Sequence, residues 1–287
     1  MTTDKVAVIT GGGAPLGLAC AQELSRRGLR LLLIDQDLGQ PAQALADQVA
    51  AGRVVLGQSD LEDVPALRRA IDGAADRFGR IDVLANCVLE PGPDGCWEVD
   101  EAAWQRCLRV NMKLPFFALQ ACVPHMRQVG GGRVVNLSSS LSAYTDGRHG
   151  LVFGLAKAGL NSMTRQWAVD LCLDNIQANS LWIGPGRPED LPRPQAVARF
   201  VAWLALDATP YLNGAQIPVD GGAALFRQGR LLEAPKSVLP PLRSGPVLFG
   251  GPETHPQKCP PSAALRSGTF RGPREPKLGS FVEVSNT

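Results

Sequence analysis

The chain has 287 residues, of which 45% are hydrophobic and 20% are charged, and its formal net charge is +2. These values are ordinary for a globular protein and suit one large domain, or one domain with an appendage. The nearly balanced charge argues against nucleic acid or an anionic membrane as a partner.

The start of the chain and its cysteines indicate a compartment. Residues 6–10 form an apolar run too short for a signal-peptide core, and no small-residue cleavage site follows it. No stretch approaches the ~20 apolar residues of a membrane-spanning helix. The seven cysteines include no CxxC pair, and their odd number favours free thiols over disulfides or a metal site. We therefore expect a cytoplasmic protein with no membrane partner and no metal.

Strand-like and helix-like runs alternate along the first three quarters of the chain. The predicted strands are residues 6–10, 30–35, 54–60, 81–87, 132–140, 176–184 and 215–222. The predicted helices are residues 16–28, 41–50, 64–79, 101–128, 149–172 and 194–207, the fourth being interrupted or reset near Pro115. This alternation predicts an α/β fold, a Rossmann-type doubly wound parallel sheet of about seven strands in a single domain, residues 1–229.

The composition changes at about residue 230. Residues 230–287 contain ten prolines and six glycines and show no sustained periodicity. Such a segment cannot bury enough surface to offset its ordering entropy, so we predict a disordered tail. A proline-rich docking segment and a translated non-homologous end are the alternatives.

A glycine-rich turn, TGGGAPLG at residues 10–17, joins the first strand to the first helix. Glycines there let the backbone approach a dinucleotide pyrophosphate, and the helix start offers free N–H groups to the anion. Asp35 ends the second strand, where a carboxylate can accept hydrogen bonds from an adenosine ribose and repel a 2′-phosphate. The pattern therefore favours NAD over NADP. The alternative is a plain tight turn followed by an ordinary strand-end carboxylate.

With these features the chain resembles the classical short-chain dehydrogenase/reductase family over roughly residues 4–226. The matching landmarks are TGGGAPLG, Asp35, Asp60-Leu61, Asn111 in RVNM, NLSSS (136–140), KAGL around Lys157, GRPED (186–190) and IPVDGG (217–222). The resemblance implies hydride transfer between NAD(P)(H) and a small-molecule carbonyl or alcohol, in a homodimer or homotetramer. The implied cofactor-binding residues are Thr10, Gly11, Gly13, Leu16, Gly17, Asp35, Asp60, Leu61, Asn86 and Lys157.

Three of the four catalytic positions of the family are matched by Asn111, Ser139 and Lys157. The resemblance implies that the serine holds the substrate oxygen and that the asparagine helps to hold a water chain. The lysine would bind the nicotinamide ribose and lower the pKa of a neighbouring acid by its charge. Ser139 is preferred to Ser138, with the choice open by one residue.

The sharpest departure from the family is Phe153, which stands at the position of the tyrosine that donates the proton. A benzyl group cannot donate a proton, and loss of general acid catalysis typically costs ~10²–10⁴-fold in rate. His149, one helical turn earlier, could supply a proton because imidazole titrates near neutrality. Tyr144 is a second candidate donor, and a solvated histidine at the helix start is the alternative for His149.

Three further departures fall near the same site. Pro15 replaces the middle glycine of the turn and removes an N–H, and NCVL at residues 86–89 replaces the usual NNAG. The substrate loop before residues 186–190 is shortened, which leaves a more open site. Two hypotheses follow: an NAD-dependent oxidoreductase that is impaired or uses a non-standard proton donor, or a pseudoenzyme that binds a dinucleotide or a protein partner.

Overall fold

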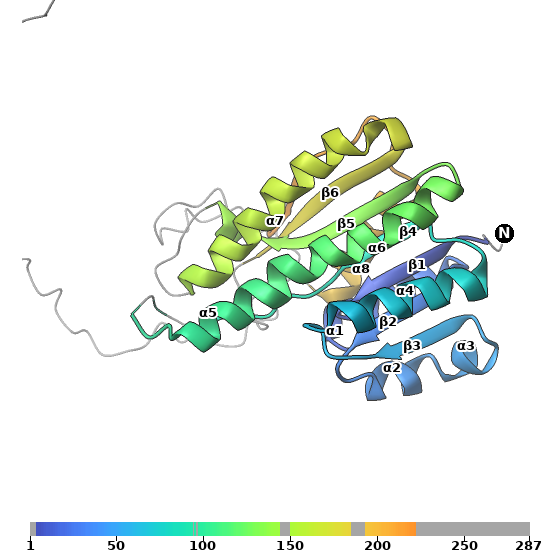
Figure 1. The fold of residues 1–287 in the computed structure, drawn as a ribbon, viewed down its shortest axis with the longest axis horizontal. Helices are drawn as coiled ribbons and strands as arrows, with labels where there is room; N and C mark the ends of the chain where they lie inside the picture. The colour runs from blue at the N-terminus through green and yellow to red at the C-terminus, as the bar shows by residue number, and fades with distance from the viewer. Residues whose placement is uncertain (1–3, 94, 96, 144–149, 185–192, 222–287) are drawn as a thin grey trace, which may run out of the picture. The chain divides into compact units, whose positions relative to one another are not determined.

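One parallel sheet organises the part of the chain that the computed structural model describes, residues 4–221 without 94, 96, 144–149 and 185–192. Its seven strands lie in the order β3-β2-β1-β4-β5-β6-β7 (Figure 1). The strands are β1 (Val6–Thr10), β2 (Arg30–Asp35), β3 (Val54–Gln58), β4 (Val83–Asn86), β5 (Gly132–Ser139), β6 (Ile176–Ile183) and β7 (Gln216–Val219). The predicted fold class and the predicted number of strands are confirmed.

Helices cover both faces of this sheet (Figure 1). The α-helices are α1 (Pro15–Arg26), α2 (Gly39–Ala44), α3 (Ala46–Ala50), α4 (Val64–Phe78), α5 (Glu101–Leu108), α6 (Leu114–Gln128), α7 (Leu151–Asp170) and α8 (Pro194–Leu206). The buried side chains of α1 and α8 belong to one core cluster, and those of α4, α6 and α7 contribute to a second. The sheet therefore separates two hydrophobic cores.

The central strand β1 shows why its sequence is a continuous apolar run. Ala7 and Ile9 belong to the core shared with α1 and α8, whereas Val6 and Val8 belong to the opposite core. All four side chains are fully buried. A parallel strand covered on both faces needs apolar residues at every position, and not at alternate positions.

Two predicted helices differ in the structure. Residues 41–50 form α2 and α3, separated at Leu45, whose backbone (φ −121°, ψ 23°) leaves the helical region while its side chain is buried. Residues 101–128 form α5 and α6, joined by a π-helical turn at Arg109–Lys113. The irregularity thus lies just before Pro115, whose missing N–H removes one hydrogen bond from this continuous run of helical backbone.

Buried polar side chains link β1, β4, β5 and α7 across the middle of the sheet. The Thr10 hydroxyl donates to Asn86 Oδ1 (3.0 Å), and Asn86 Nδ2 donates to Asn136 Oδ1 (2.8 Å). Asn136 Nδ2 donates to Thr164 Oγ1 (2.8 Å), whose own hydroxyl donates to the Leu160 carbonyl (2.8 Å). We call these four side chains the cross-sheet network. It connects the end of the first strand to the middle of α7.

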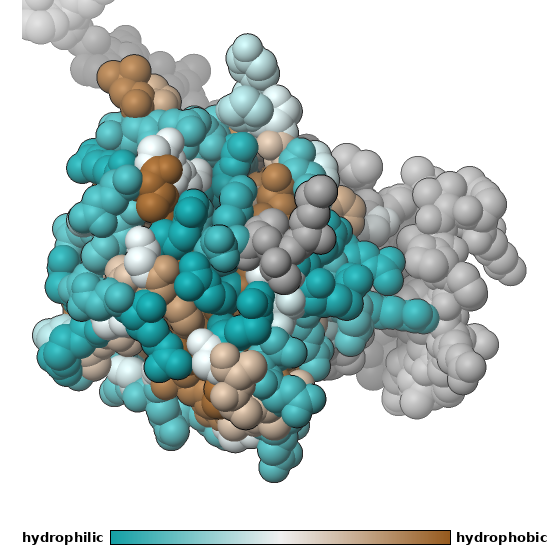
Figure 2. Space-filling view, turned by 90° about the vertical axis from the view of Figure 1, so that its right-hand side faces the viewer, coloured by the Kyte–Doolittle hydropathy of each residue, from teal (hydrophilic) through white to brown (hydrophobic). Residues whose placement is uncertain are grey.

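The two ends of the sheet differ in character. The face that exposes the amino-terminal ends of the strands is mostly hydrophilic, with scattered apolar side chains (Figure 2). All the carboxyl ends meet at the opposite edge, where the glycine-rich turn and the start of α7 lie. In open parallel sheets, ligands bind at this carboxyl edge, where the strand order reverses.

No helix in the described ranges is long and apolar enough to cross a membrane. The division of the chain at residues 229 and 230 remains a prediction, because residues 222–287 lie outside the described part.

Asn136→Ala tests the cross-sheet network. The substitution leaves the Asn86 amide without its acceptor and Thr164 Oγ1 without its donor, both in a fully buried setting. We expect the free energy of unfolding to fall by about 2–4 kcal/mol, measured by urea denaturation.

Gln166→Ala is the control for Asn136→Ala, because it removes only an exposed hydrogen bond to Asp170. A loss no larger in Asn136→Ala than in this control would contradict a structural role for the network.

Candidate functional site

The turn after β1 is held against the end of β2. The amides of Gly11 and Gly12 both donate to the Ile34 carbonyl (2.9 and 3.3 Å), and Gly11 has a positive φ of 74°. The amide of Gly13 donates to Asp35 Oδ2 (2.8 Å). The predicted turn residues and Asp35 therefore lie together.

The glycines of the turn are sterically required. A Cβ on Gly13 would lie 2.0 Å from the Asp37 carbonyl oxygen, and a Cβ on Gly17 would lie 1.9 Å from the Gly11 carbonyl oxygen. Leu16 and Gly17 follow Pro15 in the first turn of α1, where backbone N–H groups have no intrahelical acceptor. Pro15 itself offers no N–H. The close approach of backbone that a pyrophosphate needs is thus retained, with one donor fewer.

A cavity of about 190 Å³ opens beside this turn at the carboxyl edge of the sheet. Its lining residues are Gly11, Gly13, Ala14, Asp35, Gln36, Asp37, Leu61, Val88, Leu89, Glu90, Arg106 and Val110. Glycines, a strand-end carboxylate and apolar side chains fit the adenosine part of a dinucleotide. Val88 and Leu89, from the NCVL stretch, form part of its wall.

Asp60 lies on the rim of this region. Its Oδ1 accepts from the Glu62 amide (2.9 Å) and from Gln36 Nε2 (2.9 Å). These two hydrogen bonds, the backbone one first, lower the pKa of the Asp60 carboxyl. The carboxylate is therefore held as an acceptor, next to Leu61 on the cavity wall.

Asn111 is placed by the π-helical turn. Its Nδ2 donates to the carbonyls of Glu90 (2.8 Å) and Cys107 (3.0 Å), and its Oδ1 accepts from the Glu90 amide (3.2 Å). The fully buried side chain thus connects α5 to the segment that follows β4.

Lys157 on α7 reaches the ends of two strands. Its Nζ donates to the carbonyl of Val88 (2.7 Å) and to that of Leu137 (3.1 Å). The residue is 1% exposed, and burial lowers the pKa of the ammonium to about 7. In the described residues no carboxylate forms an ion pair with it, and the nearby thiols of Cys107 and Cys87 oppose the shift only in part.

Phe153 lies one helical turn before Lys157, with its ring centroid 5.6 Å from Nζ. The ring is 3% exposed and packs in an apolar cluster with Cys107, Leu141, Val152 and Ala156. A cation over an aromatic face is favourable, but the ring offers no proton.

Ser139 ends β5 in this same neighbourhood. Its Oγ accepts from the Leu141 amide (3.2 Å), whereas Ser138 Oγ donates to the Lys157 carbonyl (3.3 Å). Asn111, Ser139, Phe153 and Lys157 are therefore gathered around the ends of β4 and β5, and all are nearly or fully buried. Tyr144, His149 and residues 186–190 lie outside the described residues.

Five lining residues were not predicted from the sequence, among them Gln36 and Asp37, which directly follow Asp35. Glu90 follows β4, and Arg106 and Val110 lie on successive turns of the α5 region. For two of them the sequence offered a signal, which is their nearness to the predicted Asn111. Arg106 precedes it by five residues and Val110 by one.

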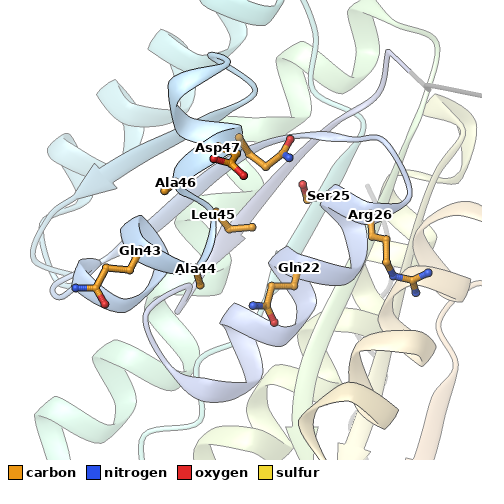
Figure 3. Close-up of a pocket in the computed structure, with 9 residues that line it drawn as sticks. Gln22, Ser25, Arg26, Gln43, Ala44, Leu45, Ala46 and Asp47 are labelled. Carbon is orange, nitrogen blue, oxygen red and sulfur yellow. The ribbon is translucent and has the colours of Figure 1, made fainter.

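A second, larger cavity of about 550 Å³ lies elsewhere, between α1 and the α2–α3 segment (Figure 3). Its walls carry Gln22, Ser25, Arg26, Gln43, Ala44, Leu45, Ala46, Asp47 and Gln48. It shares no lining residue with the cavity at the glycine-rich turn. Among the residues with described positions, no group of three or more His, Cys, Asp or Glu could hold a metal ion.

Lys157→Met gives a pH-dependent test of the buried ammonium. The folded-state pKa of about 7 lies below the ordinary value of 10.5, so the unfolded chain binds more protons between these limits and stability rises with pH across them. The stability gained by Lys157→Met should therefore be near its full value at pH 7 and should be smaller by about 3 kcal/mol at pH 9.5. Urea denaturation at both pH values measures it.

Lys113→Met, which removes an exposed lysine, is the control for this experiment. A stability difference between Lys157→Met and the parent chain that does not change with pH would contradict a depressed pKa.

Comparisons with known proteins agree with this geometry. The family model for short chain dehydrogenases matches residues 5–189. Cis-4-hydroxycyclohexanecarboxylate dehydrogenase of Sinomonas cyclohexanicum is 31% identical over 240 residues, which cover 76% of this chain and 96% of that protein. The probable galactose dehydrogenase GalD of Rhizobium meliloti (strain 1021) is 34% identical over 244 residues, covering 76% and 94%.

Solved structures show the same likeness. The crystal structure of levodione reductase superposes with a TM-score of 0.71 at 27% identity, over 78% of this chain and 99% of that one. The chain therefore belongs to the short-chain dehydrogenase family of NAD(P)-dependent oxidoreductases.

Proposed function

We propose that this protein is an NAD-linked oxidoreductase that acts on a carbonyl or alcohol group of a small molecule. We call the cavity beside the glycine-rich turn the adenosine cavity. The observation that carries the proposal is the Asp35 carboxylate, which lines this cavity and accepts a hydrogen bond from the Gly13 amide. A ribose diol can donate to a carboxylate there, whereas a 2′-phosphate would meet like charge. This supports NAD over NADP.

Each remaining polar group has a role that its surroundings support. Bound NAD would supply the hydride acceptor or donor. The hydroxyl of Ser139, the last residue of β5, would hold the substrate oxygen. The Ser138 hydroxyl instead donates a hydrogen bond to the Lys157 carbonyl on α7. Two N–H groups of the Lys157 ammonium donate to backbone carbonyls, and the third would bind the ribose hydroxyls. Asn111 would hold the segment after β4 in place.

The proton donor is the non-standard part of this proposal. Phe153 cannot act, and His149 and Tyr144 remain hypothetical donors. Within the described chain, the Lys157 ammonium is the group beside Phe153 whose pKa, about 7, suits proton transfer at neutral pH. Proton supply that relies on Lys157 in place of a phenol predicts slow turnover.

A second candidate function is a dinucleotide-binding protein without turnover. Its support is the burial of the catalytic positions: Asn111, Ser139, Phe153 and Lys157 are each 3% exposed or less. In this alternative the dinucleotide would be sensed through the adenosine cavity.

Assembly and location complete the proposal. Exposed apolar side chains lie on α5, α6 and α7, among them Trp104, Phe116, Leu151 and Leu155. They support a homodimer formed through these helices, which light scattering of the full chain tests. Cys20, Cys87, Cys107, Cys122 and Cys172 are free thiols, which supports a reducing, cytoplasmic setting.

Asp35→Ser tests the cofactor preference. Calorimetric titration should show the parent chain binding NADH more tightly than NADPH. Loss of charge-assisted hydrogen bonds should weaken NADH binding in Asp35→Ser by about 10–100-fold and remove most of the preference. Asp47→Ser, on the second cavity, is the control. Tighter binding of NADPH by the parent chain would overturn the assignment of Asp35.

Phe153→Tyr tests whether the rest of the catalytic site is intact. With Lys157 one turn away, a phenol at this position should raise turnover by about 10²–10⁴-fold. The measurement is NADH absorbance with a panel of cyclic hydroxy acids, sugars and cyclic ketones.

Phe200→Tyr on the exposed face of α8 is the control for Phe153→Tyr. If Phe153→Tyr still binds NADH but turns over nothing in the panel, the non-catalytic alternative gains support.

A further inference from the structure

An exposed ion pair lines the adenosine cavity, which the glycine-rich turn also lines. Arg106 on α5 donates through Nε (3.3 Å) and Nη2 (3.2 Å) to Oε1 of Glu90. Both residues line the cavity together with Gly11 and Gly13. The inference drawn from this ion pair rests on the proposed function, because it concerns how the cavity binds an anionic dinucleotide.

The charges around the cavity are unfavourable for such a ligand. Among its lining residues, all of which are described, Asp35, Asp37 and Glu90 are acidic and Arg106 is the one cation. A dinucleotide brings two further negative charges in its pyrophosphate. The positive end of the α1 dipole offsets part of this repulsion, but Pro15 in the first turn of α1 contributes no N–H.

The ion pair between Arg106 and Glu90 is weak enough for the two side chains to separate. The side chains of Arg106 and Glu90 are 52% and 39% exposed, and water screens such pairs strongly. Both guanidinium hydrogen bonds go to one carboxylate oxygen, so the pair lacks the parallel two-oxygen geometry of strong arginine–carboxylate contacts. The backbone of Glu90 is fixed by Asn111 at its N–H and its C=O, which leaves its side chain as the part that can turn away.

We propose that Arg106 is a cofactor-binding residue, whose guanidinium leaves Glu90 and binds the pyrophosphate of the dinucleotide. Glu90 occupies Arg106 in the free protein and competes with the ligand. Arg106 therefore supplies, from α5, an electrostatic contact that the turn with Pro15 provides less well.

The neighbouring pair Arg109 and Glu62 offers a matched control. Its Nε–Oε2 distance is 3.2 Å, and the two side chains are 43% and 25% exposed. Neither residue lines the cavity. Removal of Arg109 changes the net charge as removal of Arg106 does, without touching the proposed contact.

The test is calorimetric titration of NADH into the full chain and its variants. Arg106→Gln should weaken NADH binding by about 10–30-fold, and Arg109→Gln by no more than about twofold. Glu90→Gln should strengthen binding by about three- to tenfold, because the competing carboxylate is gone. Glu90→Gln should strengthen binding much less in the Arg106→Gln background than in the parent chain, since without Arg106 it relieves only the repulsion between Glu90 and the ligand. Added salt should weaken NADH binding more in the parent chain than in Arg106→Gln.

The outcomes separate this inference from the function on which it rests. If the parent chain binds neither NADH nor NADPH, the proposed function fails and this inference fails with it. If the parent chain binds NADH but Arg106→Gln matches Arg109→Gln, the role of Arg106 is overturned and the function stands. Additive effects of Arg106→Gln and Glu90→Gln would overturn the competition between Glu90 and the ligand. Circular dichroism checks that each variant is folded.

Discussion

The hydrogen bonds of the cross-sheet network hold the glycine-rich turn and α7 in a fixed position relative to each other. Thr10 belongs to the start of the glycine-rich turn and Thr164 to α7, and Asn86 and Asn136 connect them through the sheet. In a buried setting an unmade polar contact is costly, so these bonds strongly disfavour any other alignment of the strands. Lys157 adds a second connection, from α7 to the ends of β4 and β5. These two connections keep the cavity and the residues proposed to be catalytic in a fixed position relative to each other.

The second connection, through Lys157, bears on how a proton could be supplied without a phenol at position 153. A buried ammonium without a carboxylate partner lowers stability, and Lys157 is such a group within the described chain. Phe153 contacts it only through its ring. Under the proposed function, Lys157 would supply the electrostatic part of catalysis, whereas the ring of Phe153 supplies no proton.

Much of the fold was predictable because its signals are local. A strand covered on both faces needs successive apolar residues, as at residues 6–9, and the close backbone contacts of the turn after it need glycine, as at Gly13 and Gly17. An interruption near Pro115 was predicted, but its π-helical form and the break at Leu45 were not, because no local sequence pattern marks them. The Glu90–Arg106 pair was missed for the same reason, since it depends on where α5 packs against the segment after β4.

The π-helical turn has a consequence for how this chain tolerates changes in length. Such a turn amounts to one extra residue in an otherwise continuous helix. Removing a single residue within Arg109–Lys113 would let α5 and α6 join as a regular helix with nearly the same facing, because the π-turn has already absorbed the extra residue. Removing a residue from the regular first turn of α6 would instead rotate everything beyond it by about 100°, and Ala118 and Cys122 would leave the core. Along this helix the stretch around Asn111 is therefore the place where a one-residue deletion disturbs the core least.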